Sequence, residues 1–505
     1  MRRSGILMHI SSLPGECGIG KMGKEAYDFA DFLQKSGVSV WQILPISPTS
    51  YGDSPYQSFS VHAGNPYFID FETLEAEGLL ERSEYADVNW GDDPLRVDYE
   101  KIYRNVFPVL RKAYERFDKK SAEYRAFLNE KSDWLLNYAL FMALKDAHGG
   151  KPWQEWEKPL AMFEKKAVEA ARSEYADDID FYCVMQYWFY SQWLKLKAYC
   201  NERGISIVGD IPIYVAYDSV DVWTSPELFC LDDERIPTDV AGCPPDFFSA
   251  TGQLWGNPLY DWDYHKKTGF KWWIKRLGSA AELYDTVRID HFRGFESYYA
   301  IPYGNPTAEI GEWRKGPNTE LFEAAEKALG KMSIIAEDLG FITPEVREML
   351  DSCGYPGMKV LQFAFDGDSG CGDLPHNYAS SHCVVYTGTH DNMTLSGWCA
   401  SLSPKSVSFS KRYLRVKDRK DLPEAVIRAA WSSTGELAVA QIQDFLSESA
   451  DARMNTPSTA AGNWQYRVKN GAFTAKLAKK IYALSELFYR LPEKEEKEPE
   501  TELML

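Results

Sequence analysis

The amino-acid sequence predicts an α/β protein, a (β/α)8 TIM barrel with long helical and loop insertions. Eight short apolar runs follow one another along the chain, and helical patterns separate most of them. This alternation is typical of a barrel of parallel strands rather than of a doubly wound sheet. Four of the runs finish at an acidic residue, and active sites of such barrels form at the carboxyl ends of the strands. The sequence therefore predicts a barrel with an acidic rim.

The composition indicates a globular protein inside the cell. The chain has 505 residues, of which 45% are hydrophobic and 26% charged, which suits one long barrel with insertions. A formal net charge of −18 argues against binding to nucleic acid or to an anionic membrane. The nine cysteines lack metal-binding spacing, so we expect reduced thiols and a cytoplasmic location.

The first strand, residues 6–10, is followed by a glycine-rich loop and a helix over residues 24–36. Gly18, Gly20 and Gly23 match the dinucleotide-binding pattern. The next strand, residues 38–44, carries no acidic residue at its end that would hold a ribose. We therefore expect the glycines to shape the loop and predict no nucleotide cofactor.

The loop after the second strand carries Tyr56, which offers a ring face to a sugar or packs within the loop. A helical insertion then runs from about residue 71 to residue 203, too long for a simple crossover. Its last helix, residues 180–203, is apolar on nearly all sides, which predicts a buried helix. Gly204 is expected to end this helix.

The third strand, residues 205–209, ends at Asp210, and residues 216–264 are dense in Pro, Gly and aromatic residues. A loop of that length is usually a lid or a binding element. A helix over residues 270–284 leads to the fourth strand, which starts at Val287 and ends at Asp290. The remaining strands are expected at residues 332–336, 359–363, 383–387 and 437–442.

The carboxylates at the strand ends suggest glycosidic chemistry. Arg288 and Asp290 are two residues apart on a strand and share a face, so the guanidinium keeps Asp290 ionised as a nucleophile. An ordinary internal ion pair is the alternative reading. Glu337 follows an apolar run, where burial would raise its pKa and make it a proton donor, and Asp391 is a third acidic partner. The same oxygens would also suit a divalent metal ion.

Several different short motifs follow one another along nearly the whole chain. Two of them are Arg288-Ile289-Asp290-His291-Phe292-Arg293-Gly294 and Thr389-His390-Asp391-Asn392; the others are residues 4–7, 12–15, 18–20, 53–57, 209–212 and 336–340. This series resembles the 4-α-glucanotransferases of the amylomaltase or disproportionating-enzyme family, a branch of the α-amylase clan. The resemblance implies a retaining double displacement in which Asp290 attacks the anomeric carbon, Glu337 protonates the leaving oxygen and Asp391 stabilises the oxocarbenium-like state.

The resemblance also implies a set of residues that bind the sugar. They are Tyr56, Asp210, Trp255, Arg288, His291, His390 and Asn463. Tyr56 would stack on a bound glucose, and Asp210 would support the site. Trp255, within residues 246–256, would belong to a loop arching over the active site. Asn463 and Trp464 would lie in a second loop facing it.

The resemblance implies 4-α-glucanotransferase activity on 1,4-α-glucans, with maltooligosaccharides and amylose as donor and acceptor, no cofactor and no metal. The carboxylates alone do not distinguish transfer from hydrolysis, and a catalytically idle glucan-binding protein is a further alternative. The match of the acceptor-side loops favours transfer, which conserves the bond energy in a covalent intermediate.

We expect residues 1–491 to form one catalytic barrel that carries both insertions, residues 71–203 and 216–264. The family that the chain resembles lacks a separate C-terminal β-domain. In this chain only an apolar-faced helix, about residues 476–491, and an acidic tail follow residue 470. The tail, residues 492–505, has the composition of a disordered segment.

Overall fold

The central sheet contains all eight strands that the sequence predicts. The computed structural model describes residues 2–50, 52–245, 249–459 and 461–493. The sheet strands are β1 (Arg3–Leu7), β2 (Val40–Gln42), β3 (Ser206–Pro212), β6 (Thr286–Asp290), β9 (Ile334–Ala336), β10 (Gly357–Val360), β11 (Cys383–Tyr386) and β12 (Leu437–Gln441). Two strands lie earlier than predicted: β1 ends at Leu7, before a 3-10 turn at residues 10–12, and β10 ends at Val360, before a 3-10 turn at residues 361–363.

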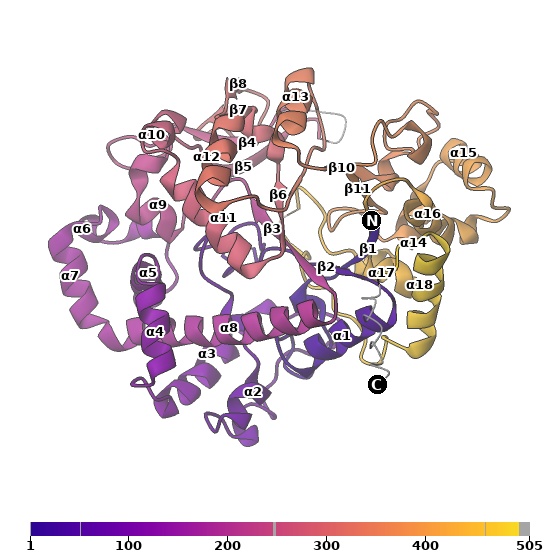
Figure 1. The fold of residues 1–505 in the computed structure, drawn as a ribbon. Coiled ribbons are helices and arrows are strands. Elements are labelled where there is room, and N and C mark those ends of the chain that lie inside the picture. Colours follow the sequence, from indigo (N-terminus) through magenta and orange to yellow (C-terminus); the bar gives the residue numbers. More distant parts are fainter. Residues whose placement is uncertain (1, 51, 246–248, 460, 494–505) are drawn as a thin grey trace, which may run out of the picture.

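The strands form a nearly closed barrel (Figure 1). They are ordered β10-β11-β12-β1-β2-β3-β6-β9, and every neighbouring pair is parallel. Between the two ends of this order, β9 and β10, the main-chain N–H of Ala336 donates to the carbonyl of Pro356 at 3.0 Å. The predicted (β/α)8 architecture is confirmed.

Helices surround the barrel and bury one face against it (Figure 1). In α1, for example, the apolar residues Ala26, Phe29, Ala30 and Leu33 recur at helical spacing and are buried. The outer helices are α1 (Lys24–Lys35), α8 (Ala176–Glu202), α11 (Lys271–Leu283), α12 (Thr319–Leu329), α13 (Pro344–Cys353), α14 (Leu395–Ser401), α15 (Pro404–Leu414), α16 (Leu422–Ser432), α17 (Ile442–Leu446) and α18 (Ala475–Leu487).

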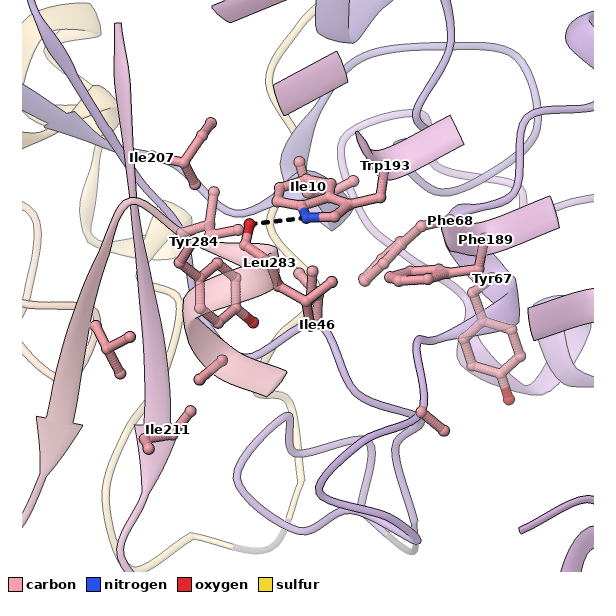
Figure 2. Packing of buried hydrophobic residues seen from close by; sticks show 14 of the residues in the cluster. Ile10, Ile46, Tyr67, Phe68, Phe189, Trp193, Ile207, Ile211, Leu283 and Tyr284 are labelled. Atoms are coloured by element: carbon pink, nitrogen blue, oxygen red, sulfur yellow. Dashed lines mark hydrogen bonds between the residues drawn. The ribbon is translucent and has the colours of Figure 1, made fainter. Parts of the chain in front are cut away.

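The insertion after β2 is helical, and α8 is the buried helix that the sequence predicts. Its Trp193 indole donates to the carbonyl of Leu283 at 2.9 Å, and Phe189 lies among the buried side chains of the same region (Figure 2). Gly204, with a φ of +70°, follows the helix end. The other helices of the insertion are α2 (Phe71–Ala76), α3 (Tyr99–Arg116), α4 (Ala122–Glu130), α5 (Leu135–Ala147), α6 (Lys158–Ala161) and α7 (Lys165–Glu174).

The sequence predicts a long loop region over residues 216–264, but the structure has helices and strands there. This segment contains α9 (Val220–Thr224), α10 (Trp262–Lys267) and two strands, β4 (Asp239–Cys243) and β5 (Gln253–Pro258). These strands join β7 (Ser297–Pro302) and β8 (Glu312–Lys315) in a four-stranded antiparallel sheet of order β5-β4-β7-β8. Glycines within β4 and β5 suggest turns in the sequence, whereas in the structure β5 pairs with β4, and β4 pairs on its other side with the distant strand β7. Residues 246–248 lie outside the described residues.

The glycine-rich loop packs against other segments and leaves no room for a phosphate at its glycines. A Cβ on Gly18 would lie 2.3 Å from the carbonyl oxygen of Trp90, and one on Gly20 would lie 1.8 Å from that of Ile10. The Lys21 ammonium donates to the carbonyls of Tyr67 and Ile69 at 2.9 and 3.1 Å. The glycines thus permit close backbone contacts, as expected for a loop-shaping role.

The end of the described chain is helical. No strand occurs within residues 442–459 and 461–493, where α17 and α18 are the main elements. Most of the predicted acidic tail, from residue 494 onward, lies outside the described residues. None of the helices in the described ranges combines the length and apolar character needed to cross a membrane.

Candidate active site

One buried guanidinium links two carboxylates at the rim of the barrel. Asp210 on β3 and Arg288 on β6 are register partners in neighbouring strands. Arg288 contacts Asp210 through Nη1 (2.6 Å to Oδ2) and Asp290 through Nη2 (3.1 Å to Oδ1). The side chains of Arg288 and Asp290 thus share a face, as their spacing predicts, and 32% of the Asp290 side chain is exposed.

Burial and charge act in opposite directions on this cluster. Burial tends to lower the pKa of Arg288, but the attraction of Asp210 and Asp290 outweighs it and raises that pKa well above its usual value. Complete burial raises the pKa of Asp210, while Arg288 opposes the rise. The guanidinium therefore stays charged and holds both carboxylates.

Glu337 lies beside Asp290 because their strands are neighbours. Ile289 on β6 and Ala336 on β9 are register partners, and Asp290 and Glu337 are the residues that follow them. The Glu337 carboxyl accepts hydrogen bonds from the main-chain N–H groups of His291 (2.7 Å) and Leu339 (3.0 Å). Burial, followed by the negative charge of Asp290, raises the pKa of Glu337 to about 8. Glu337 is thus protonated at neutral pH, which is the state a proton donor requires.

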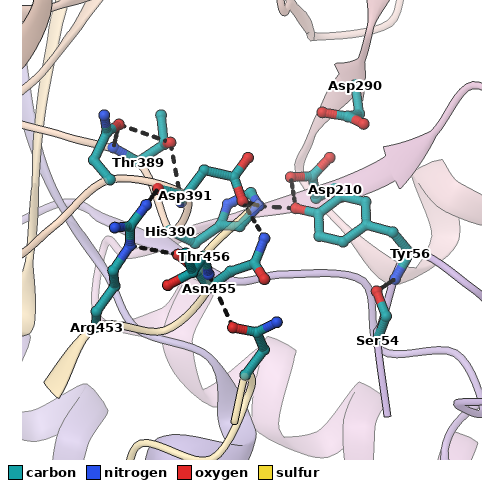
Figure 3. A network of polar contacts seen from close by, with 12 residues as sticks. Ser54, Tyr56, Asp210, Asp290, Thr389, His390, Asp391, Arg453, Asn455 and Thr456 are labelled. Carbon is teal, nitrogen blue, oxygen red and sulfur yellow. Dashed lines mark hydrogen bonds and ion pairs between the residues drawn. The ribbon is translucent and has the colours of Figure 1, made fainter. Parts of the chain in front are cut away.

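Three aromatic rings gather next to these carboxylates. Tyr56 stacks on His390 with ring centroids 5.1 Å apart and an interplanar angle of 17°, and Trp464 lies 5.8 and 5.9 Å from the two rings. The Tyr56 hydroxyl donates to Asp210 Oδ2 at 2.9 Å (Figure 3). Tyr56 therefore reaches the acidic cluster through its hydroxyl, a link that the sequence does not reveal.

Asp391 is held on a loop after β11 by residues that sequence reasoning missed. The Asn455 side-chain amide donates to Asp391 Oδ1 at 2.6 Å, and the Arg453 guanidinium donates to the Asp391 carbonyl (Figure 3). His390 Nε2 lies 3.3 Å from Asp391 Oδ1. Asn455 and Arg453 come from a loop about 60 residues further along the chain, and no motif marks them.

His291 and Trp255 meet at the turn that follows Asp290. His291 has a left-handed backbone, with φ of 51° and ψ of 47°. Burial lowers the pKa of its imidazole to about 3, so the ring is neutral. The ring lies edge-on to the indole of Trp255, with centroids 4.8 Å apart. Trp255 thus extends from β5 over the turn that follows Asp290.

Asn463 differs from the other predicted binding residues because its side chain bonds within its own loop. Its oxygen accepts from the main-chain N–H of Thr456 at 2.9 Å, and its nitrogen donates to the carbonyl of Thr459 at 3.0 Å. The structure does not bring Asn463 onto the carboxylates. Its neighbour Trp464 does contact the site, through Tyr56 and His390.

The carboxyl groups at the barrel rim contact a guanidinium and main-chain N–H groups. Asp210 and Asp290 face Arg288, and Glu337 accepts from main-chain N–H groups. In the described part of the chain, no group of three or more His, Cys, Asp and Glu side chains is placed to hold a metal ion.

Comparisons with known proteins converge on one family. A family model described as 4-alpha-glucanotransferase matches residues 8–474. The 4-alpha-glucanotransferase of Clostridium butyricum is 48% identical over 486 residues, covering 96% of this chain and all of that protein. The Thermus thermophilus protein of the same name is 46% identical and covers 97% of this chain and 99% of its own length.

Solved structures agree with these relatives. The amylomaltase from Streptococcus agalactiae in complex with acarbose is 42% identical, with a TM-score of 0.95, over 97% of this chain and all of that chain. The amylomaltase from Corynebacterium glutamicum is only 18% identical but shares the fold, with a TM-score of 0.78 over 97% of this chain and 74% of that chain.

Proposed function

Because the chain belongs to the 4-alpha-glucanotransferase family, we propose that Asp290, Glu337 and Asp391 carry out its transfer of α-glucan segments by a retaining double displacement. The enzyme cleaves a 1,4-linkage of a donor glucan and passes the freed segment to the 4-hydroxyl of a second glucan or of glucose. The single observation that supports these residue roles best is the pairing of Asp290, held by Arg288, with Glu337, whose pKa is raised.

In the first step, the Asp290 carboxylate attacks the anomeric carbon of the donor as the bond to the leaving oxygen breaks. Glu337 gives its proton to that oxygen, so the leaving chain departs as a neutral alcohol and Glu337 becomes a carboxylate. Asp391, oriented by Asn455, stabilises the positive charge that develops on the sugar ring. The product is a glycosyl ester on Asp290.

In the second step, the 4-hydroxyl of the acceptor attacks the same carbon and displaces Asp290. The Glu337 carboxylate takes the proton of that hydroxyl, which restores the starting state. Water would give hydrolysis by the same route, so exclusion of water decides the outcome. We assign this exclusion to Trp255 and to the loop with Asn463 and Trp464, which border the site from two sides.

Sugar binding would use the groups that surround the carboxylates. Tyr56, fixed by its hydrogen bond to Asp210, would present its ring to a glucose unit. Arg288 would donate hydrogen bonds to sugar hydroxyls. His291 and His390 would donate or accept them, since burial lowers the pKa of both imidazoles and keeps them neutral. The nine free thiols suit a reducing compartment, and we propose a cytoplasmic location.

The test is incubation of the protein with pure maltotriose, with chain lengths and reducing ends followed together. Transfer yields longer chains and glucose at constant reducing ends, whereas rising reducing ends would show hydrolysis. Asp290→Asn should abolish both, because an amide is a poor nucleophile, with kcat falling by more than about 1,000-fold.

A matched control is Asp31→Asn, which removes another carboxylate paired with an arginine. Asp31 lies 2.8 Å from Arg203, away from the acidic cluster, and its replacement should leave kcat within about twofold of the parent value. Full activity of Asp290→Asn would show that the nucleophile is another residue. Loss of activity in both variants would point to folding rather than to chemistry.

A further inference from the structure

The antiparallel sheet presents an indole from each of its two edge strands to the turn after the nucleophile. β5 and β8 are the edges of the order β5-β4-β7-β8. Trp255 on β5 contacts His291, and Trp313 on β8 lies against Arg293, whose guanidinium carbon is 4.0 Å from the centre of the ring. The sheet thus places one aromatic residue on each side of the segment 291–293.

Trp313 is exposed but held in one orientation. About 41% of the residue is open to solvent. Its ring lies 5.3 Å from that of Tyr299, its register partner on β7. Arg293 is itself fixed, because it donates to Ser297 Oγ at 2.9 Å and to the carbonyl of Phe341. An indole fixed by a cation and a neighbouring ring loses little conformational entropy when a ligand covers it.

Phe341 extends this surface toward the proton donor. It follows Glu337 by four residues, and 75% of it is exposed. Its carbonyl oxygen accepts from the Arg293 guanidinium, so Arg293 connects the loop after β9 with the ring of Trp313. Two large apolar side chains are therefore exposed next to both catalytic loops. Exposed apolar surface of this kind usually marks a binding site.

We propose that Trp313 and Phe341 form an outer platform that binds a 1,4-α-glucan chain beyond the sugars held at the carboxylates. The C–H faces of glucose rings pack on aromatic rings, and a neutral chain is compatible with the acidic protein. Lys315, on the same face of β8, is exposed and is held by an ion pair with the buried Glu296, so its remaining N–H groups would bond sugar hydroxyls. The choice of ligand rests on the glucan activity of the family, and continuity with the catalytic loops favours a glucan over a protein partner.

The test compares Trp313→Ala with the parent enzyme on a short and a long substrate. Loss of one stacking surface should raise KM for amylose about three- to tenfold, while kcat and KM for maltotriose stay unchanged. Trp313→Tyr, which keeps a ring, should restore most of the affinity for amylose. Tyr489→Ala is the matched control, since Tyr489 is 78% exposed at the far end of α18 and should leave both substrates unaffected.

Binding without turnover gives a second readout. In native gels that contain amylose, Asp290→Asn should be retarded, and the double variant Asp290→Asn/Trp313→Ala should be retarded less. Equal retardation of the two, or an unchanged KM for amylose, overturns the platform. An equal loss on maltotriose would place Trp313 in the catalytic subsites and also overturns the platform. An altered molar mass of the Trp313→Ala variant in light scattering, with unchanged amylose binding, overturns it as well. Maltotriose transfer by the parent enzyme reports separately on the proposed function.

Discussion

Arg288 determines how charge is divided among the three carboxyl groups nearest to it. Its two terminal nitrogens contact Asp210 and Asp290, and its charge opposes the rise in the pKa of Asp210 that burial causes. Burial of Glu337 and the negative charge of Asp290 favour its protonated form, although the main-chain N–H of His291 and the charge of Arg288 oppose this shift. The assignment of nucleophile and proton donor thus follows from which carboxyl group the guanidinium reaches.

The raised pKa of Glu337 predicts a fall in activity at alkaline pH. Transfer needs the protonated form, which persists through neutral pH and is lost as the pH rises through about 8. Above that value the rate should fall about tenfold per pH unit. The measurement is kcat/KM for maltotriose across the pH range. A profile that stays flat above pH 9 would contradict the assignment of Glu337 as proton donor.

The raised pKa of Glu337 also changes how the stability of the fold depends on pH. The folded state holds the Glu337 proton more tightly than the unfolded chain, where the pKa is 4.5. Folding stability is therefore lost as the pH rises from about 5 to about 8, because the unfolded state binds fewer protons there. Glu337→Gln should lose less stability than the parent over that range in urea titrations.

Asn455 is expected to act as a positioning residue for Asp391. Removal of its amide in Asn455→Ala frees the carboxylate that it holds at 2.6 Å. Because small misplacements of catalytic groups are costly, kcat should fall about tenfold to a hundredfold with little change in KM. The control is Asn201→Ala, which removes an amide that bonds Asp285 outside the site. A change in KM alone would assign Asn455 to substrate binding instead.

The sequence predicts part of this site and not the rest, for a physical reason. Arg288, Asp290 and Glu337 follow from strand periodicity and from the apolar runs before them. The contacts of Asn455 and Tyr56 depend on loops that approach from distant parts of the chain. Loop paths are set by tertiary packing, so a local pattern carries no signal for them.

At the scale of elements, the strongly periodic segments are predicted best. The apolar runs of the barrel strands and the all-round apolar α8 appear where expected, because burial on both sides leaves few polar residues. β4 and β5 were predicted as a loop. β4 pairs with β5 and with β7, which lies more than 50 residues further along the chain, and short strands with glycine have weak intrinsic preference.

Gly209 has no side chain, which lets β3 pack closely against Tyr284, just before β6. A Cβ at this position would lie 2.1 Å from the ring of Tyr284, so Gly209→Ala should lower the free energy of unfolding by about 1–3 kcal/mol. Thermal or urea unfolding measures the change. Gly372→Ala is the control, because a Cβ there meets nothing within 4 Å. Equal stability of the two variants would mean that Tyr284 moves aside without cost.

At the scale of the whole molecule, the end of the described chain packs against the starts of β1 and β12. Arg490, after α18, is fully buried and donates to the carbonyls of Arg3, Trp431, Ser433 and Gly435. The N-terminal strand and the segment before β12 are thereby tied together. The sequence predicts the single barrel from its eight apolar runs, but a lone arginine beside a helix gives no sign of these contacts.

The junction between β9 and β10 makes the ring of strands uneven in stiffness. Every other neighbouring pair is joined by a ladder of hydrogen bonds, whereas the ring closes here through the bond from Ala336 to Pro356. Glu337 directly follows β9, whereas Asp290 is the last residue of β6, which is paired on both sides. We therefore expect Glu337, the proposed proton donor, to lie on a more compliant part of the ring than Asp290, the proposed nucleophile, so that the separation of the two carboxyl groups adjusts to the sugar mainly by movement of Glu337.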